Sequence, residues 1–352
     1  RTFQLVGPFA GFFGTARRWR NKMDAKITEE SILELARGFM ASRVLLSGAE
    51  LDLFTLLARE PLTAEEIAVA AKTKLRGTVI LLDALSALGF LVKKDGRYHT
   101  EPSVAPLLSA PAPDSILPMV LHMGTVWQNW SQITDIVLGK TTPGLKTKGA
   151  LAKDNRKAFI GAMHVVASKA APEVVAAINP GQARRLLDVG GGSGTYTLAM
   201  LSAMPEMKAT LFDLPPVIEM AHDRVQAVDM LDRVVLVAGD FYKDELPPGH
   251  DLALLSAIIH QSSYEQNEVL YGKIYRALDV GGRIVVRDHV MSSDRTHPLE
   301  GALFAVNMLA GTEGGRTYTF DEIKEGLTAV GFTRINLIQT KGMFSLVEGF
   351  KP

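Results

Sequence analysis

Residues 186–201 read LLDVGGGSGTYTLAML and decide the fold of the second half of the chain. The stretch opens with apolar residues around Asp188, passes through a turn with four glycines in five positions, and continues as a helical pattern to about residue 204. We therefore predict a buried strand, a glycine turn and a helix, in that order. Glycine tolerates positive φ and lets a ligand approach the backbone, so the turn is a candidate cofactor site.

The glycine turn does not fit two common nucleotide-binding patterns. A dinucleotide fingerprint, G-x-G-x-x-G, needs a third glycine where this chain has Thr195 or Thr197, depending on the start. A phosphate loop of the form G-x-x-x-x-G-K-[ST] does not occur in the sequence either. The pattern that does fit is D-x-G-x-G-x-G over residues 188–194.

Short apolar runs alternate with helical patterns around this turn. The predicted strands are 185–189, 209–212, 234–238, 252–257 and 283–287. The predicted helices are 194–204, 216–228, 264–279 and 320–330. This alternation predicts a parallel sheet with helices on both faces. Two final runs, 335–339 and 344–348, are joined by too few residues for a crossover and must pair antiparallel.

Each predicted parallel strand carries a polar residue at its carboxyl end or shortly after it. These residues are Asp188, Asp213, Asp240, His260 and Asp288. The carboxyl ends of parallel strands share one edge of the sheet, where open α/β sheets bind their ligands. One such acid alone would indicate a helix cap or a solvated side chain, but five at successive strand ends indicate a binding site.

The N-terminal part of the chain predicts helices followed by a hairpin. Helical spacing runs over 27–58, a capping box at 63–66 opens a short helix, and another helix follows over 78–88. Strands at 90–92 and 97–99 then complete a winged-helix pattern. Residues 62–100 hold six basic and four acidic side chains, too small a surplus for a DNA-binding face. A packing or dimerisation module is favoured instead.

Composition limits the partners and the compartment. Lys and Arg total 38, as do Asp and Glu, so no surplus of positive charge favours nucleic acid or an anionic membrane. Cysteine is absent, which excludes disulfides and thiolate metal sites, and we expect no metal. No apolar run approaches the roughly 18–20 residues that cross a bilayer. We expect a soluble, cytoplasmic protein that acts on a small molecule.

The chain is long enough for two cores, and four segments are predicted. Residues 1–22 are expected to be an extension that is disordered or left over from expression, with an over-called start or a partner-binding arm as the alternatives. Residues 23–110 form the winged-helix-like dimerisation domain. Residues 111–179 form a helical connector that supplies substrate-pocket helices, and residues 180–352 form the cofactor-binding catalytic domain.

Six motifs together resemble one enzyme family. They are LLDVGGGSGTYTLAML (186–201), FDLPPVIEMA (212–221), RVVLVAGDFY (233–242), a strand ending in His260, GGRIVVRDHV (281–290) and GGRTYTFDEIKEGLTAVGF (314–332). The chain resembles the S-adenosylmethionine-dependent small-molecule O-methyltransferases, which include plant caffeate, animal acetylserotonin and bacterial enzymes. The resemblance implies an α/β fold with a Rossmann-like seven-stranded domain and a helical domain that forms a homodimer. It also implies a small, aromatic or polyketide-like methyl acceptor.

The resemblance also assigns residues to the cofactor. The cofactor-binding candidates are Asp188, Gly190, Gly192, Asp213, Asp240, Phe241 and Ser256. The glycines would carry the methionine part, with Asp188 close to its amine. Asp213 would accept hydrogen bonds from both ribose hydroxyls, because a carboxylate suits a vicinal diol. Asp240 and Phe241 would hold the adenine. Helix capping by Asp188 and turn formation by Asp240 remain the alternatives.

For catalysis, the resemblance makes His260 the general base and Asp288 the acid that orients it. The sulfonium is already an activated methyl donor, so the enzyme must align the attack and remove a proton from a hydroxyl. An imidazole with a pKa of about 6.5 can do so near neutral pH. Alternatively, His260 belongs to the loop before the capping box at 263–266. His289 should face the other side of its strand and is set aside.

The chain departs from the family pattern at three places. Gln261-Ser262 replaces the common Asp-Trp after the histidine. Thr317 stands where caffeate-type enzymes carry a second orienting Glu, and Ser256 stands where a Lys is often found. These changes indicate a bacterial branch whose acceptor is not defined by the sequence.

Six residues are candidates for the acceptor pocket, although ordinary core packing is the alternative for each. They are His122, Trp127, Phe159, Met163, Asn307 and Met308. A flat apolar slot would suit an aromatic or polyketide-like ring. Methyl transfer to carbon or nitrogen on the same scaffold, or a non-catalytic regulator that binds the cofactor, are the alternative functions. A nicotinamide oxidoreductase is disfavoured by the missing third glycine.

Overall fold

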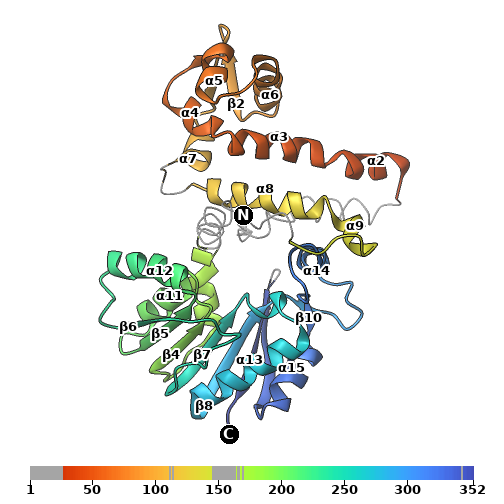
Figure 1. Cartoon of the computed structure of the whole chain (residues 1–352). Helices are drawn as coiled ribbons and strands as arrows, with labels where there is room; N and C mark the ends of the chain where they lie inside the picture. The colour runs from red at the N-terminus through yellow and green to blue at the C-terminus, as the bar shows by residue number, and fades with distance from the viewer. Residues whose placement is uncertain are drawn as a thin grey trace, which may run out of the picture. The chain divides into compact units, whose positions relative to one another are not determined.

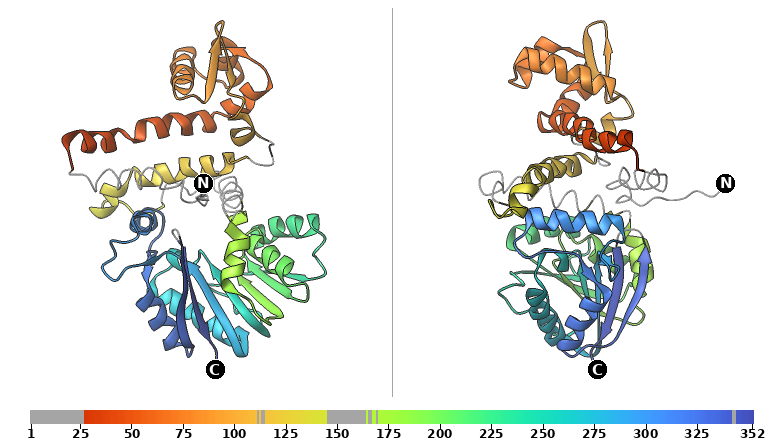
Figure 2. Two further views of the ribbon diagram at one scale, coloured as in Figure 1. Left: turned by 180° about the vertical axis from the view of Figure 1, so that it is seen from behind. Right: turned by 90° about the vertical axis from the view of Figure 1, so that its right-hand side faces the viewer.

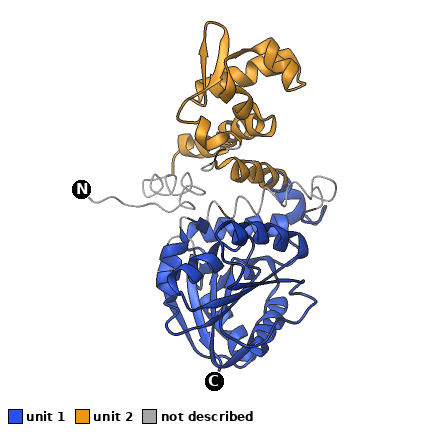
Figure 3. Cartoon of the chain, turned by 90° about the vertical axis from the view of Figure 1, so that its left-hand side faces the viewer, with its two compact units in different colours: residues 1–18, 129–146, 166–352 blue, residues 19–128, 147–165 orange. Residues whose placement is uncertain are grey.

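The computed structural model describes residues 27–110, 112, 115–144, 164, 167–168, 170–341 and 344–352. These residues divide into two compact units (Figure 3). One unit takes in 27–128 and residue 164, and the other takes in 129–144 and the described residues from 167 onward. The predicted extension 1–22 lies outside the described residues, as do residues 145–163 of the predicted helical connector.

The N-terminal unit consists of short helices and a small sheet. Its elements are α2 (Glu29–Arg37), α3 (Phe39–Glu50), α4 (Leu53–Arg59), β1 (Leu62–Thr63), α5 (Ala64–Ala70), α6 (Leu75–Ala87), β2 (Leu91–Lys94), β3 (Arg97–Thr100), α7 (Ala105–Leu108) and most of α8 (Leu117–Trp130). The sheet has the order β1-β3-β2, and its core includes the fully buried Phe54 and Leu82. The predicted capping box is present, because Thr63 and Glu66 bond each other's backbone N–H groups.

Two local expectations in this unit need correction. The first hairpin strand spans Leu91–Lys94 instead of 90–92, and the second ends at Thr100 instead of residue 99. Asp95 and Gly96 both adopt positive φ and turn the chain between the two strands. The stretch 102–118 is rich in proline, alanine and serine, a composition typical of a connector, but it contains α7 and the first residues of α8.

The C-terminal unit is built on a seven-stranded sheet (Figure 1). Its strands are β4 (Arg185–Val189), β5 (Lys208–Asp213), β6 (Val234–Ala238), β7 (His250–Ser256), β8 (Leu278–Asp288), β11 (Thr333–Lys341) and β12 (Phe344–Phe350). The order is β11-β12-β8-β7-β4-β5-β6, and β12 pairs antiparallel with both β11 and β8 while the other pairs are parallel. The predicted fold class and the antiparallel end of the sheet are therefore confirmed.

Helices and a second small sheet complete this unit. They are α9 (Ile133–Val137), α11 (Thr195–Ala203), α12 (Pro215–Ala227), the 3-10 helix η2 (Ile259–Gln261), α13 (Tyr264–Ala277), β9 (Val290–Met291), α14 (Leu299–Gly311), β10 (Tyr318–Thr319) and α15 (Phe320–Ala329). Residues 170–178 are also helical.

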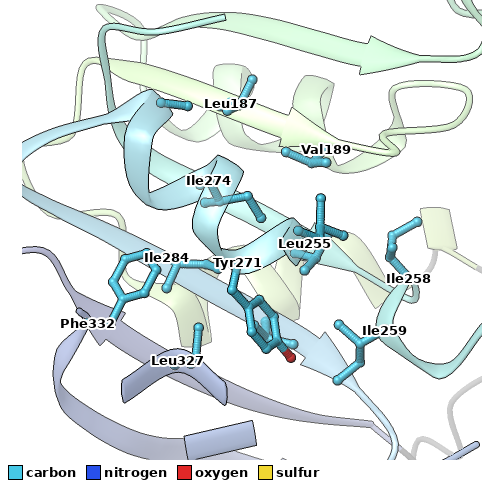
Figure 4. Packing of buried hydrophobic residues seen from close by; sticks show 14 of the residues in the cluster. Leu187, Val189, Leu255, Ile258, Ile259, Tyr271, Ile274, Ile284, Leu327 and Phe332 are labelled. Atoms are coloured by element: carbon cyan, nitrogen blue, oxygen red, sulfur yellow. The ribbon is translucent and has the colours of Figure 1, made fainter. Parts of the chain in front are cut away.

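Helices cover both faces of the large sheet (Figures 1 and 2), and alternation along β4 shows how. Leu187 and Val189 belong to a cluster with residues of α13 and α15, which Figure 4 shows from close by. Leu186 belongs to the opposite cluster, with Met200 of α11 and Val225 of α12. Truncating a fully buried leucine of this kind costs about 2–5 kcal/mol. Packing on both faces thus fixes the strands in place. The candidate active site lies at their carboxyl ends.

Candidate active site

The glycine turn after β4 has a backbone that only glycine adopts readily. Gly190, Gly192 and Gly194 have φ of +68°, +59° and +79°. A Cβ atom on Gly190 would lie 2.5 Å from the Ile258 side chain, so packing also requires glycine there. At Gly192, by contrast, a Cβ would meet no heavy atom within 4 Å. The backbone at Gly192 therefore faces open space that a ligand can enter.

Asp188 is buried near the end of β4, just before the glycine turn. It is 2% exposed, and the Thr197 hydroxyl donates a hydrogen bond of 2.6 Å to its Oδ2. Burial raises the pKa of Asp188 to about 6, and the nearby charge of Asp213 acts in the same direction. The contact with Thr197 ties Asp188 to the first turn of α11. A cationic ligand group would favour the ionised form of this carboxyl.

Asp213 joins the end of β5 to the glycine turn. Its Oδ2 accepts a hydrogen bond of 2.8 Å from the Gly192 N–H, and its Oδ1 accepts one of 2.7 Å from the Leu214 N–H. Burial raises the pKa of Asp213, while these two bonds oppose the shift. Each carboxylate oxygen has two acceptor sites, so both oxygens keep the capacity to accept from a diol.

The loop after β6 is held from two sides. Asp240 accepts a hydrogen bond of 3.0 Å from the Tyr242 N–H and forms an ion pair of 2.9 Å with Lys243. The bond with Lys243 holds the pKa of Asp240 below its usual range. From α13, the buried Lys273 donates bonds of 2.8 Å to the carbonyls of Phe241 and Asp244. The ring of Phe241 is thereby fixed beside Gly190.

The structure brings His260 and Asp288 together. His260 lies in η2, and its Nδ1 is 2.8 Å from Oδ1 and 3.1 Å from Oδ2 of Asp288, which is fully buried. Burial opposes ionisation of Asp288, but the neighbouring His260 and His289 outweigh it, so the pKa of Asp288 lies below its usual range. Because an ionised carboxylate only accepts, Nδ1 carries the proton and Nε2 of a neutral ring is an acceptor.

The motif at 314–317 supports His260 through its backbone, a role that the sequence did not reveal. The Arg316 N–H donates a bond of 2.8 Å to the carbonyl of His260. A Cβ on Gly315 would lie 2.5 Å from that same carbonyl oxygen, so only glycine fits. The ring of Phe304, on α14, meets the His260 ring edge to face at 4.8 Å. Backbone bonds and ring packing thus fix the imidazole in place.

The expectation for His289 was wrong. Its ring lies 6.1 Å from that of His260 and stacks on Phe304 at 4.0 Å between ring centroids. The strand β8 ends at Asp288, and the His289 N–H donates a bond of 2.7 Å back to the Asp288 carboxylate. Strand alternation therefore does not extend to His289, and its side chain lies next to the candidate base.

Ser256 stands beside a cation that sequence reasoning missed. Arg287 is its register partner on β8 and donates a bond of 3.3 Å to the Ser256 hydroxyl. Arg287 is buried, and its guanidinium lies over the rings of Phe344 and Tyr196. An arginine inside an otherwise apolar strand, IVVRD, is the signal that could have revealed it.

The acceptor candidates fall into three groups. Asn307 and Met308 lie on α14, which packs against η2, and Asn307 accepts a bond of 2.9 Å from the Trp130 ring N–H. His122 and Trp127 belong to the N-terminal unit, where Trp127 lies under the guanidinium of Arg43. Burial lowers the pKa of His122 to about 4. The remaining two candidates, Phe159 and Met163, lie outside the described residues.

Two general features of the described residues bear on the site. They contain no group of three or more His, Cys, Asp or Glu that could hold a metal ion. None of their helices is long and apolar enough to cross a membrane.

The strand order, the glycine turn and the acids at the carboxyl edge define a Rossmann-like methyltransferase fold. Comparison with known families then places the chain further. The O-methyltransferase domain matches residues 137–333, and the O-methyltransferase dimerisation domain matches residues 33–109. The chain belongs to this O-methyltransferase family.

Relatives and solved structures agree with that placement. The chain is 31% identical to the tetracenomycin polyketide synthesis 8-O-methyl transferase of Streptomyces glaucescens, covering 91% of this chain and 96% of the relative. It is 30% identical to the 3-hydroxy-5-methyl-1-naphthoate 3-O-methyltransferase of Streptomyces sahachiroi, covering 91% and 94%. Human N-acetylserotonin methyltransferase in complex with S-adenosylmethionine superposes with a TM-score of 0.76 at 26% identity, covering 93% and 99%.

The protein is therefore an S-adenosylmethionine-dependent methyltransferase. The residues present fit that cofactor. The backbone of Gly192 is open to a ligand, and the Asp213 carboxylate at the neighbouring strand end keeps acceptor capacity for a diol.

Proposed function

We propose that the protein methylates a hydroxyl of a small aromatic or polyketide-like molecule, with His260 as the general base. The observation that carries this proposal is the 2.8 Å contact between Nδ1 of His260 and the carboxylate of the buried Asp288. By their names, two relatives act on a polyketide and on a hydroxynaphthoate, which supports an aromatic hydroxyl as the acceptor.

Residues at three strand ends would hold the cofactor. We assign the methionine part to the turn around Gly190 and Gly192, with its amine towards Asp188. The ribose would bind Asp213, whose position is fixed by two backbone bonds. The loop of Asp240 and Phe241, held by Lys273, would take the adenine. When bound, S-adenosylmethionine supplies a methyl group on a positively charged sulfur.

Proton removal is the task left to the protein. With its Nδ1 proton held by Asp288, a neutral His260 presents Nε2 to accept the proton of an acceptor hydroxyl. The low pKa of Asp288 keeps this carboxylate ionised near neutral pH, so it stabilises the imidazolium that forms. The ring of Phe304 packs edge to face against His260 and stacks on His289, so an aromatic surface borders the candidate base. This surface suits a flat aromatic acceptor, and Asn307 and Met308 on the same helix are proposed to extend it.

Turnover assays test this proposal against its alternatives. The purified protein is incubated with S-adenosylmethionine labelled with ¹³C at the methyl group and with a panel of hydroxynaphthoates and phenols. We expect S-adenosylhomocysteine to form and the label to appear at the chemical shift of an O-methyl group. A carbon- or nitrogen-bound methyl would support the alternative chemistry. The same assay is repeated with small molecules extracted from the natively purified protein. Tight cofactor binding without turnover of any of these compounds would support a non-catalytic regulator.

We also infer that the N-terminal helices form a homodimer. In the single chain, α2 buries none of its residues. Ile32 and Leu35 on α2, and Phe39 and Met40 at the start of α3, are each more than half exposed. Exposed apolar side chains gathered in this way are typical of an interface. The family's dimerisation domain includes Leu35, Phe39 and Met40 and begins one residue after Ile32, which supports a second copy of the chain as the partner.

A further inference from the structure

Arg287 carries a buried charge that the described structure leaves largely unsatisfied. Its relative exposure is 6%, and its guanidinium has five N–H donors. Only one hydrogen bond uses them among the described residues, the 3.3 Å contact with the neutral Ser256 hydroxyl. No carboxylate forms an ion pair with Arg287 within the described part of the chain. A buried cation in this state is costly unless a ligand completes its coordination.

Aromatic rings hold the guanidinium in position. Its central carbon lies 3.9 Å from the ring centroid of Phe344 and 5.1 Å from that of Tyr196. Such contacts stabilise a cation and restrict its rotation, but aromatic rings provide no acceptor for the N–H groups, which lie in the plane of the guanidinium. The side chain is thus preorganised to donate to a planar anion.

A second donor lies next to it. Tyr196 is 9% exposed, and its buried hydroxyl has no hydrogen-bond partner among the described residues. It sits in the first turn of α11, directly after the glycine turn. The guanidinium of Arg287 and the hydroxyl of Tyr196 would both be satisfied by one carboxylate.

The sheet register places this pair on the same face as Asp188. Leu186 and Val285 belong to one core cluster, and Asp188 and Arg287 lie two residues further along the same strands. Only β7 separates these strands. The carboxylate of Asp188 and the guanidinium of Arg287 therefore lie on one face of the sheet near the glycine turn. A ligand with both an amine and a carboxylate requires this pair of charges.

We propose that Arg287, assisted by Tyr196, binds the α-carboxylate of the methionine part of the cofactor, while Asp188 faces its amine. This inference rests on the proposed placement of the cofactor at the glycine turn. It adds a carboxylate subsite that none of the sequence motifs indicated. Both residues are binding residues and take no part in the proton transfer assigned to His260.

The test compares two adenosine ligands by calorimetry. S-Adenosylhomocysteine has the amino-acid carboxylate, and 5′-methylthioadenosine lacks the whole amino-acid end. We expect Arg287→Met to weaken S-adenosylhomocysteine by about 10- to 100-fold, as loss of a bond to a charged group implies. The affinity for 5′-methylthioadenosine should stay within about twofold. Because Arg287 has no carboxylate partner among the described residues, the substitution leaves none of their anions unpaired, and the melting temperature should stay the same or rise.

Two further variants guard the interpretation. Arg283→Met removes an arginine from the same strand that is paired with Glu348, and it should change neither affinity. Tyr196→Phe deletes only the hydroxyl and should weaken S-adenosylhomocysteine alone, by about 3- to 10-fold. It decides the question if Arg287→Met does not fold.

Three results would overturn the proposal. Full affinity of the Arg287 and Tyr196 variants for S-adenosylhomocysteine would show that these residues do not form a carboxylate subsite. Equal weakening of both ligands would indicate general damage. If the Arg287 variant raised only the KM of acceptors that have a carboxylate, such as hydroxynaphthoates, and not that of naphthols, Arg287 would bind the acceptor instead of the cofactor. If instead even wild-type protein bound neither adenosine ligand, the proposed cofactor site itself would fail.

Discussion

Replacing Asp213 by alanine should abolish most cofactor affinity. The carboxylate is proposed to accept two hydrogen bonds from the ribose, and a bond to a charged group contributes about 1.5–3 kcal/mol. Two such bonds correspond to about 3–6 kcal/mol, or a loss of about 10²- to 10⁴-fold in affinity for S-adenosylhomocysteine. The substitution also frees the Gly192 and Leu214 N–H groups, so a decrease in unfolding free energy of about 1–3 kcal/mol is expected.

Calorimetry of Asp213→Ala and Asp213→Asn separates these two effects. Asparagine keeps one acceptor oxygen, so it should retain more of the affinity than alanine does. Asp223→Ala, at an exposed position of α12, serves as the control and should bind normally. Wild-type affinity in a folded Asp213→Ala protein would refute the assignment of the ribose to this strand end.

Three further predictions concern the assembly, a buried acid and the support of the base. The double substitution Leu35→Glu and Phe39→Glu should convert a dimer to a monomer in light scattering at micromolar concentration, and a monomeric wild type would contradict the dimer. Asp188 has a raised pKa, so it destabilises the free protein increasingly as the pH rises from about 4 to about 6. Asp188→Asn should therefore raise the unfolding free energy at pH 8 by up to about 3 kcal/mol but leave it nearly unchanged at pH 4, and a pH-independent effect would argue against the raised pKa. Gly315→Ala should displace the His260 carbonyl and lower kcat while sparing cofactor affinity, and an unchanged kcat would show that the loop tolerates the added methyl.

Strand positions could be predicted closely from the sequence because local pattern determines them. The residues of β4 and β6 form short, buried apolar runs that end at turn-forming residues, and their predicted bounds match the structure. The strand β8 begins at Leu278, five residues before the predicted start at Arg283. Gly281 and Gly282 look like a break in the sequence, but the structure carries them within the strand, next to an irregularity in its pairing with β7.

The site residues at strand ends could be predicted from the sequence. Contacts made by segments that return to the sheet later in the chain could not. Asp213, Asp240 and Asp288 follow or end their strands, so the sheet brings them to one edge. The contact between Phe304 and His260 depends on how α14 returns to the sheet, and no local pattern specifies that return. Arg287 occupies a strand position that alternation assigns to the core, where a charged side chain is rare, so the pattern did not indicate it.

Removal of the acceptor proton by His260 is tested by the pH dependence of methyl transfer in His260→Ala. The rate of methyl transfer to a phenolic acceptor should fall by about 10²- to 10⁴-fold at pH 7, with unchanged affinity for S-adenosylhomocysteine. The deficit should shrink towards pH 10, where a phenol with a pKa of about 10 ionises without help. His222→Ala, at an exposed site on α12, should behave as wild type. A His260→Ala enzyme that binds cofactor normally and keeps near wild-type rates across neutral pH would contradict the claim and make His260 a structural residue.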